Sequence, residues 1–204
     1  MREGLVVLGL GGVGRALART ACRAGWRVVL LDRDEQAVDR MLREGFAATT
    51  KERVLGTVGT VAICAAVPQA RDGAFDLSAV RCASEAVSRH LRPGALIALE
   101  SVGCPRIAEE VVRPSLERSG LAAGTDFRLA WSPRWDDPAL GQPKVVTGLT
   151  ARCADAAASF YGTFLPRVRQ TAAGGCAVGA PPGGCTAAGG REGVPRQRGA
   201  NGRP

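Results

Sequence analysis

GLVVLGLGGVGRALARTACRAGWRVVLLD, residues 4–32, is the stretch that decides the fold. Leu5 to Leu8 are apolar and suit a short buried strand, and residues 27–31 suit a second one. Between them, a helix is expected over about residues 13–24. The stretch is therefore predicted to be a strand–turn–helix–strand unit of a parallel α/β sheet.

The turn after the first strand has the spacing G-x-G-x-x-G. Gly9 permits a sharp turn that a side chain would block, Gly11 lets the backbone approach a pyrophosphate, and Gly14 lets the helix pack closely on the strand. The N-terminal N–H groups of the helix then point at the phosphates. With Gly12 and Val13, these glycines form the predicted phosphate-binding turn of a dinucleotide site.

Asp32 ends the second strand, about 20 residues after the glycines, where a carboxylate can accept hydrogen bonds from the adenosine ribose hydroxyls. A carboxylate repels the 2′-phosphate of NADP, so Asp32 favours NAD as the cofactor. Arg33 follows directly and keeps NADP open. The alternative to a dinucleotide site is a glycine-rich turn in another parallel α/β protein.

The composition restricts the classes of function. The net charge is +8, but the arginines are spread along predicted helices and aromatic residues are only 4%, so we expect no nucleic-acid partner. No apolar run is long enough to cross a membrane, and the first residues enter a strand without a signal peptide. These features predict a cytoplasmic protein.

The seven cysteines and one histidine match no zinc-ligand spacing, so no metal site is predicted. In a cytosolic chain, most of the cysteines should be reduced, small core residues. His90 lies near a predicted helix end, where the helix dipole favours it. We therefore expect His90 to be structural rather than a catalytic base.

Strands and helices alternate through the rest of the chain, up to residue 171. The expected helices cover residues 34–43, 51–55, a stretch opening at Asp76, 107–119 and 151–164, and the expected strands cover residues 46–48, 57–67, 95–99, 127–131, 144–147 and 167–171. This order predicts one α/β domain over residues 1–171: a Rossmann-type, doubly wound parallel sheet with helices on both faces. Its cofactor crevice should lie where the apolar run ends, at Val67 and Pro68.

The composition changes after residue 171. Residues 172–204 are rich in Gly, Ala, Pro and Arg and have almost no large apolar side chain. Such a segment cannot bury enough surface to offset its chain entropy, so it is expected to be a disordered tail. Its composition also resembles a GC-rich gene translated out of frame, and we hypothesise that the tail is such a product.

Several segments, in order, resemble the UDP-glucose/GDP-mannose dehydrogenase family, especially its UDP-N-acetylmannosamine dehydrogenase branch. They are VVLGLGGVGRALA (6–18), VVLLDRDEQAVDRM (28–41), ICAAVP (63–68) with FDLSAV (75–80), LIALES (96–101) with EEVVRPSLERSGL (109–121), AGTDFRLAWSP (123–133), and PKVVTGLT (143–150) with FYGTF (160–164). The resemblance covers only the N-terminal cofactor domain of the family.

The resemblance implies an enzyme of polysaccharide biosynthesis that oxidises the C6 alcohol of a UDP-sugar to a carboxylate and reduces NAD twice. In the family, a cysteine and a lysine of the middle helix and C-terminal domain carry the reaction. We expect this chain to lack both regions, and with them the dimerisation helix, so no catalytic residue is assigned here. Ser101 matches a family serine near the nicotinamide.

The loops around that serine depart from the family. Two threonines that follow it in the family are absent from residues 102–107, and Arg134 replaces a family glutamate of the water-dependent step. Cys104, in the same loop, is a weak candidate for a substitute nucleophile; a small residue in a drifted loop is the alternative.

Three hypotheses follow. The first is an NAD-dependent nucleotide-sugar dehydrogenase, and the second is an NAD-binding module without turnover. The third, a small reductase, lacks a Tyr-x-x-x-Lys pair, since no lysine follows the only tyrosine, Tyr161. We expect the isolated chain to be inactive.

Overall fold

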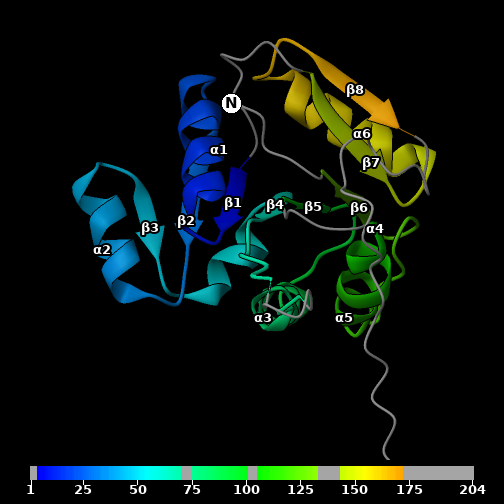
Figure 1. Cartoon of the computed structure of the whole chain (residues 1–204), viewed down its shortest axis with the longest axis horizontal. Coiled ribbons are helices and arrows are strands. Elements are labelled where there is room, and N and C mark those ends of the chain that lie inside the picture. Colours follow the sequence, from blue (N-terminus) through cyan, green and yellow to red (C-terminus); the bar gives the residue numbers. More distant parts are fainter. Residues whose placement is uncertain (1–3, 70–74, 101–104, 133–142, 172–204) are drawn as a thin grey trace, which may run out of the picture.

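A computed structural model describes residues 4–69, 75–100, 105–132 and 143–171. Eight strands form one sheet with helices on both sides (Figure 1). The strands are β1 (Gly4–Leu8), β2 (Arg27–Leu31), β3 (Ala47–Thr49), β4 (Thr60–Ile63), β5 (Leu96–Leu99), β6 (Arg128–Trp131), β7 (Lys144–Gly148) and β8 (Val168–Thr171). The helices are α1 (Gly12–Arg23), α2 (Glu35–Arg43), the 3₁₀-helix η1 (Glu52–Thr57), α3 (Ser78–Ser88), α4 (Pro105–Ile107), the π-helix η2 (Ala108–Val112), α5 (Arg113–Glu117) and α6 (Ala151–Gly162).

The strand order is β3-β2-β1-β4-β5-β6-β7-β8. Its first six strands have the order of a doubly wound dinucleotide-binding sheet. β2 and β3 lie on one side of β1, and β4, β5 and β6 lie on the other side, so the strand order reverses between β1 and β4. All neighbouring strands are parallel except β6 and β7, which pair antiparallel through Ala130–Gly148 and Trp131–Thr147. The predicted Rossmann-type α/β fold is confirmed, with a mostly parallel sheet.

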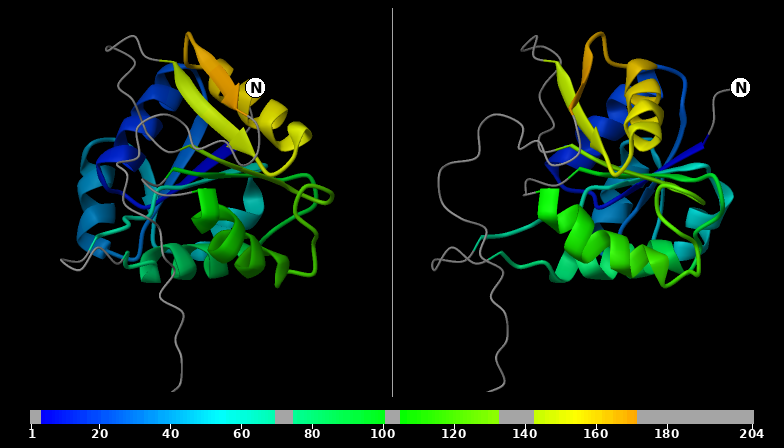
Figure 2. Two further views of the ribbon diagram at one scale, coloured as in Figure 1. Left: turned by 45° about the vertical axis from the view of Figure 1, so that its right-hand side comes forward. Right: turned by 90° about the vertical axis from the view of Figure 1, so that its right-hand side faces the viewer.

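Two hydrophobic cores lie on opposite faces of the sheet. On one face, α1 and α6 cover the strands, and α3 and α5 cover the other face (Figure 2). Leu17, Ala18 and Ala21 of α1 are buried at helical spacing, as are Val80, Ala83 and Val87 of α3. Because the central strands are covered on both faces, β4 and β5 are buried at every residue.

Local capping signals fix the helix ends. The Asp34 side chain accepts a hydrogen bond from the Gln36 N–H at the start of α2, and Thr150 caps α6 in the same way with the Cys153 N–H. Gly45 has a φ of 85° just after α2, which a glycine adopts without strain. The predicted helices at 34–43 and 151–164 are therefore confirmed, with small shifts of their ends.

Two predicted elements differ from the structure. The apolar run 57–67 forms a strand only at Thr60–Ile63, because η1 takes its first residue and the chain leaves the sheet after Ile63. The predicted helix 107–119 is a continuous helical segment with π geometry at Ala108–Val112. Pro114 in the next turn has no N–H to donate to the Glu110 carbonyl, and its ring would crowd that carbonyl in a regular α-helix.

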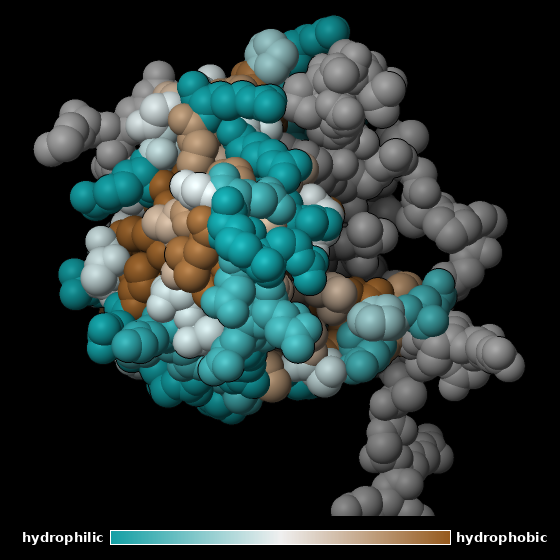
Figure 3. Space-filling view, turned by 90° about the vertical axis from the view of Figure 1, so that its left-hand side faces the viewer, coloured by the Kyte–Doolittle hydropathy of each residue, from teal (hydrophilic) through white to brown (hydrophobic). Residues whose placement is uncertain are grey.

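The surface is mostly hydrophilic on the side of α2, with a few smaller apolar areas (Figure 3). Among the described large hydrophobic side chains, only Leu42 of α2 is exposed. No described helix combines the length and the apolar character that a membrane span requires. The four described cysteines, Cys22, Cys64, Cys82 and Cys153, are free thiols, and two of them are buried.

Candidate functional site

Gly9 and Gly14 are required by the backbone of the turn itself. Gly9 has a φ of 103°, and a Cβ there would lie 2.7 Å from the Cys64 carbonyl oxygen. A Cβ on Gly14 would lie 2.0 Å from the Gly9 carbonyl oxygen. The Gly9 N–H donates to the Leu31 carbonyl at 2.9 Å, which ties the turn to the end of β2. These two glycines therefore let β1, β4 and α1 approach one another closely.

Gly11 and Gly12 face open space instead. A Cβ at either position would meet no atom within 4 Å. Gly11 precedes α1 in an extended conformation, with φ −66° and ψ −174°, and no described side chain caps the helix. The first N–H groups of α1 are thus exposed at the positive end of a 12-residue helix. This arrangement is suited to an anion such as a pyrophosphate.

Asp32 lies beside this turn at the carboxyl end of β2. One of its carboxylate oxygens accepts a hydrogen bond from the Leu10 N–H at 2.8 Å, and the other accepts from the Asp34 N–H at 3.1 Å. These bonds fix the carboxylate next to the glycine turn, half-buried and open to the cleft described next. The position suits a carboxylate that accepts hydrogen bonds from ribose hydroxyls.

A cleft of about 380 Å³ opens at the carboxyl ends of β1, β2 and β4. Its lining comes from the glycine turn, the end of β2, the start of η1, the residues after β4, and α3: Leu8, Gly9, Leu10, Gly11, Leu31, Asp32, Arg33, Thr50, Glu52, Cys64, Ala65, Ala66, Ser78, Ala79, Cys82, Ala83 and Ala86. The cleft thus has the place in the sheet at which dinucleotides bind.

The structure brings together part of the predicted site. Gly9, Gly11, Asp32 and Arg33 line the cleft. The remaining described candidates do not line it: Gly12, Val13 and Gly14 form the first turn of α1, and Val67 and Pro68 follow β4. Ser101 and Cys104 lie outside the described residues, as do Arg134 and the tail from residue 172.

Sequence reasoning missed two parts of the cleft. The first is the face of α3 with small side chains, at Ala79, Cys82, Ala83 and Ala86. Helical spacing predicts this face, but it reads equally well as core packing. The second is Glu52, whose place in the cleft near Arg33 depends on the path of the chain through β3 and therefore leaves no local signal in the sequence.

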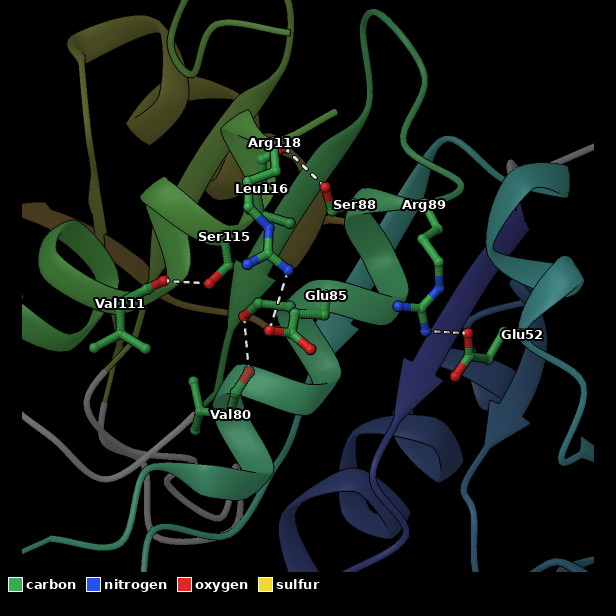
Figure 4. Close-up of polar contacts among 10 residues, drawn as sticks. Glu52, Val80, Glu85, Ser88, Arg89, Val111, Ser115, Leu116 and Arg118 are labelled. Carbon is green, nitrogen blue, oxygen red and sulfur yellow. Dashed lines mark hydrogen bonds and ion pairs between the residues drawn. The ribbon is translucent and has the colours of Figure 1, made fainter. Parts of the chain in front are cut away.

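Glu52 links two arginines at the edge of the cleft. One of its carboxylate oxygens lies 2.6 Å from Arg89 Nη2, and the other lies 3.6 Å from Arg33 Nη2. Figure 4 shows the contact with Arg89, which reaches Glu52 from the end of α3. The hydrogen bond from Arg89, helped by the charges of both arginines, lowers the pKa of Glu52. Glu52 is therefore ionised at neutral pH.

A buried charge cluster lies under the neighbouring strand ends. Glu100 follows β5, and its carboxylate lies 2.6 Å from Lys144 Nζ at the start of β7. The hydroxyl of Tyr161 on α6 donates to the other Glu100 oxygen. Burial, followed by the charge of Glu100, raises the pKa of Tyr161 and that of the Cys64 thiol. The cluster joins β7 and α6 to the centre of the sheet.

Strand order, glycine turn and cleft together define a Rossmann-type dinucleotide-binding domain. A family model described as "UDP-glucose/GDP-mannose dehydrogenase family, NAD binding domain" matches residues 41–161, which begin after the glycine turn. The match covers more than half of the chain, and the protein belongs to this family of oxidoreductases. A nicotinamide dinucleotide is the cofactor of this domain.

Solved structures of the family share the fold. UDP-D-ManNAc dehydrogenase from Pyrococcus horikoshii is 24% identical, with a TM-score of 0.73, over 83% of this chain and 47% of its own. The UDP-N-acetyl-mannosamine dehydrogenase Cap5O from Staphylococcus aureus is 23% identical, with a TM-score of 0.74. The match covers 83% of this chain and 48% of that protein. GDP-mannose dehydrogenase from Pseudomonas aeruginosa is 20% identical, with a TM-score of 0.72. The match covers 83% of this chain and 46% of that protein.

The chain thus spans about half the length of the solved structures that it matches. No curated protein sequence matches it.

Proposed function

We propose that this chain binds NAD in the cleft at the carboxyl ends of β1, β2 and β4, as the cofactor domain of a nucleotide-sugar dehydrogenase. The observation that carries the proposal is the pairing of Asp32 with the glycine turn. The Leu10 N–H fixes the carboxylate beside a turn whose Gly11 is open to solvent. A ribose acceptor and a phosphate-binding helix end are thereby held side by side.

The residues of the cleft and of the adjoining first turn of α1 fit the three parts of the adenosine diphosphate half of NAD. Gly11, Gly12 and Val13 would hold the pyrophosphate through backbone N–H groups, and Asp32 would accept hydrogen bonds from the ribose. The small side chains of α3 form an apolar wall of the cleft, which would contact the adenine. When bound, NAD supplies the acceptor for a hydride. We assign Val67, Pro68 and Ser101 to the nicotinamide half, on their positions after β4 and β5.

For the whole protein we propose oxidation of the C6 alcohol of a UDP-sugar to a carboxylate, with two NAD reduced for each sugar. The UDP-sugars named for two similar structures support this substrate class. In this proposal the reaction takes place in the cytoplasm and supplies acidic sugars for polysaccharide biosynthesis. In this proposal, the described residues bind and orient the cofactor, and none of them is the nucleophile.

The second candidate is an NAD-binding module without turnover. The sequence of the loops favours it, since Arg134 stands in place of the family glutamate and cannot act as a base at neutral pH. Both candidates require NAD binding, and they differ in whether NADH forms. An absorbance assay for NADH with a panel of UDP-sugars separates them.

Isothermal titration calorimetry of the full chain with NAD tests NAD binding, which both candidate functions require. Gly11→Ala and Gly162→Ala form a matched pair, because a Cβ at either glycine meets no atom within 4 Å, so both variants should fold. We expect Gly11→Ala to weaken NAD binding by about tenfold or more, whereas Gly162→Ala on α6 binds like the wild type. Equal NAD affinity of all three proteins would contradict the proposed site.

A further inference from the structure

The ribose end of the cleft holds a cation as well as the Asp32 carboxylate. Arg33 lines the cleft, and 66% of its side chain is exposed. An arginine next to the acidic residue at the end of β2 is the type of group that accommodates the 2′-phosphate of NADP. Arg33 alone would therefore permit NADP in a site where Asp32 favours NAD.

Glu52 changes this balance. Its carboxylate lies 3.6 Å from the Arg33 guanidinium and lines the same cleft. Arg89 anchors it through a hydrogen bond of 2.6 Å to the other carboxylate oxygen (Figure 4). Because Arg89 comes from the end of α3, the position of Glu52 is fixed by two elements rather than by η1 alone.

The charges at the ribose end then disfavour a phosphate. Asp32 and Glu52 each contribute a negative charge. Arg33 supplies one positive charge, which is already paired with Glu52, and Arg89 supplies another, which is hydrogen-bonded to the second Glu52 oxygen. A phosphate monoester brings about −1.5 to −2 charges at neutral pH. To bind the phosphate, Arg33 would have to leave Glu52. The phosphate would then face the Asp32 carboxylate and the Glu52 carboxylate, of which only Glu52 keeps a counter-ion, Arg89.

We propose that Glu52 is a specificity-determining residue that makes this site reject NADP, by holding Arg33 in an ion pair and by adding a second carboxylate at the ribose end. The inference rests on the proposed function, since it concerns the same cofactor cleft. It assigns to Glu52 a role in discrimination, with little effect on NAD itself, whose ribose carries a neutral hydroxyl at this position.

Titration calorimetry of the full chain with NAD and with NADP tests the proposal. Glu52→Gln should raise the ratio of NADP affinity to NAD affinity by about tenfold. Adenosine 2′,5′-bisphosphate and ADP serve as shorter probes of the same end and should show the same contrast. Glu44→Gln is the matched control, because it breaks an exposed Arg–Glu pair of 2.6 Å with Arg19 outside the cleft lining.

A second variant keeps the test decisive if Glu52→Gln does not fold. With Glu52 in place, Arg33→Gln should change NADP affinity by less than about twofold; a loss of about tenfold would show that Arg33 already serves the phosphate, and would overturn the inference. An unchanged ratio of NADP to NAD affinity in folded Glu52→Gln would overturn it too.

A wild type that binds both cofactors equally would refute the role of Glu52 and leave the proposed site standing. A wild type that binds neither would refute the proposed function and the inference together.

Discussion

Lys144→Met should strongly destabilise the fold, because it removes one partner of a buried ion pair. Lys144 and Glu100 lie 2.6 Å apart, with 2% and 0% of their side chains exposed. Methionine matches the length of the lysine stem but carries no charge. After the substitution, the Glu100 carboxylate keeps the hydroxyl of Tyr161 as a hydrogen-bond donor but loses its counter-ion.

Removing one member of a buried pair typically costs about 3–5 kcal/mol, against a total stability of about 5–15 kcal/mol for a domain. With a urea m-value of about 2 kcal/mol/M, the unfolding midpoint should fall by about 2 M. Urea unfolding at neutral pH, followed by circular dichroism, measures this shift. The m-value should stay constant if the fold is unchanged.

The double variant Lys144→Met/Glu100→Gln provides the control. Removing the Glu100 charge as well should restore about 2 kcal/mol of the free energy of unfolding, because the uncompensated Glu100 carboxylate is the main cost of the single variant. A loss below about 1 kcal/mol in the single variant would refute this account of the cluster. So would a double variant whose loss equals the sum of the two single losses.

Two further predictions concern the same structure. Burial and Glu100 raise the pKa of Tyr161 above the unfolded value of about 10, so the fold keeps full stability below that pH and should lose about 1.4 kcal/mol per unit as the pH rises above it. Tyr161 is the only tyrosine, so ultraviolet titration should show its phenolate appearing only with unfolding; an earlier phenolate would contradict this. Gly14→Ala should lower the melting temperature, because its Cβ would lie 2.0 Å from the Gly9 carbonyl oxygen, whereas Gly12→Ala should not.

The sequence predicted the strand–turn–helix start because each signal there is local. Gly9 needs a positive φ, Gly14 needs close backbone contact, and the apolar spacing of α1 marks its buried face. The alternation of the remaining elements likewise predicted the fold class. The strand predicted over residues 57–67 was too long, because the apolar residues after Ile63 continue past the end of the strand, where some of them line the cleft.

Long-range pairings left no such signal. Glu100 and Lys144 are 44 residues apart, and Glu100 and Tyr161 are 61 apart. Each is an ordinary polar residue in its own segment, and only the packing of β7 and α6 beside β5 unites them. Glu52 similarly reaches Arg33 and Arg89 only after β3 and α3 are placed. The sequence thus identified the glycine turn, Asp32 and Arg33, but not the ion pairs that Glu52 makes near them.

A crystal structure of the full chain with NAD would show directly whether the cofactor occupies this cleft. We expect the adenosine ribose on the Asp32 carboxylate, the pyrophosphate over Gly11 and the start of α1, and the adenine against Ala79 and Cys82. Density for NAD away from this cleft, or a folded chain that stays without NAD at saturating concentration, would contradict this expectation.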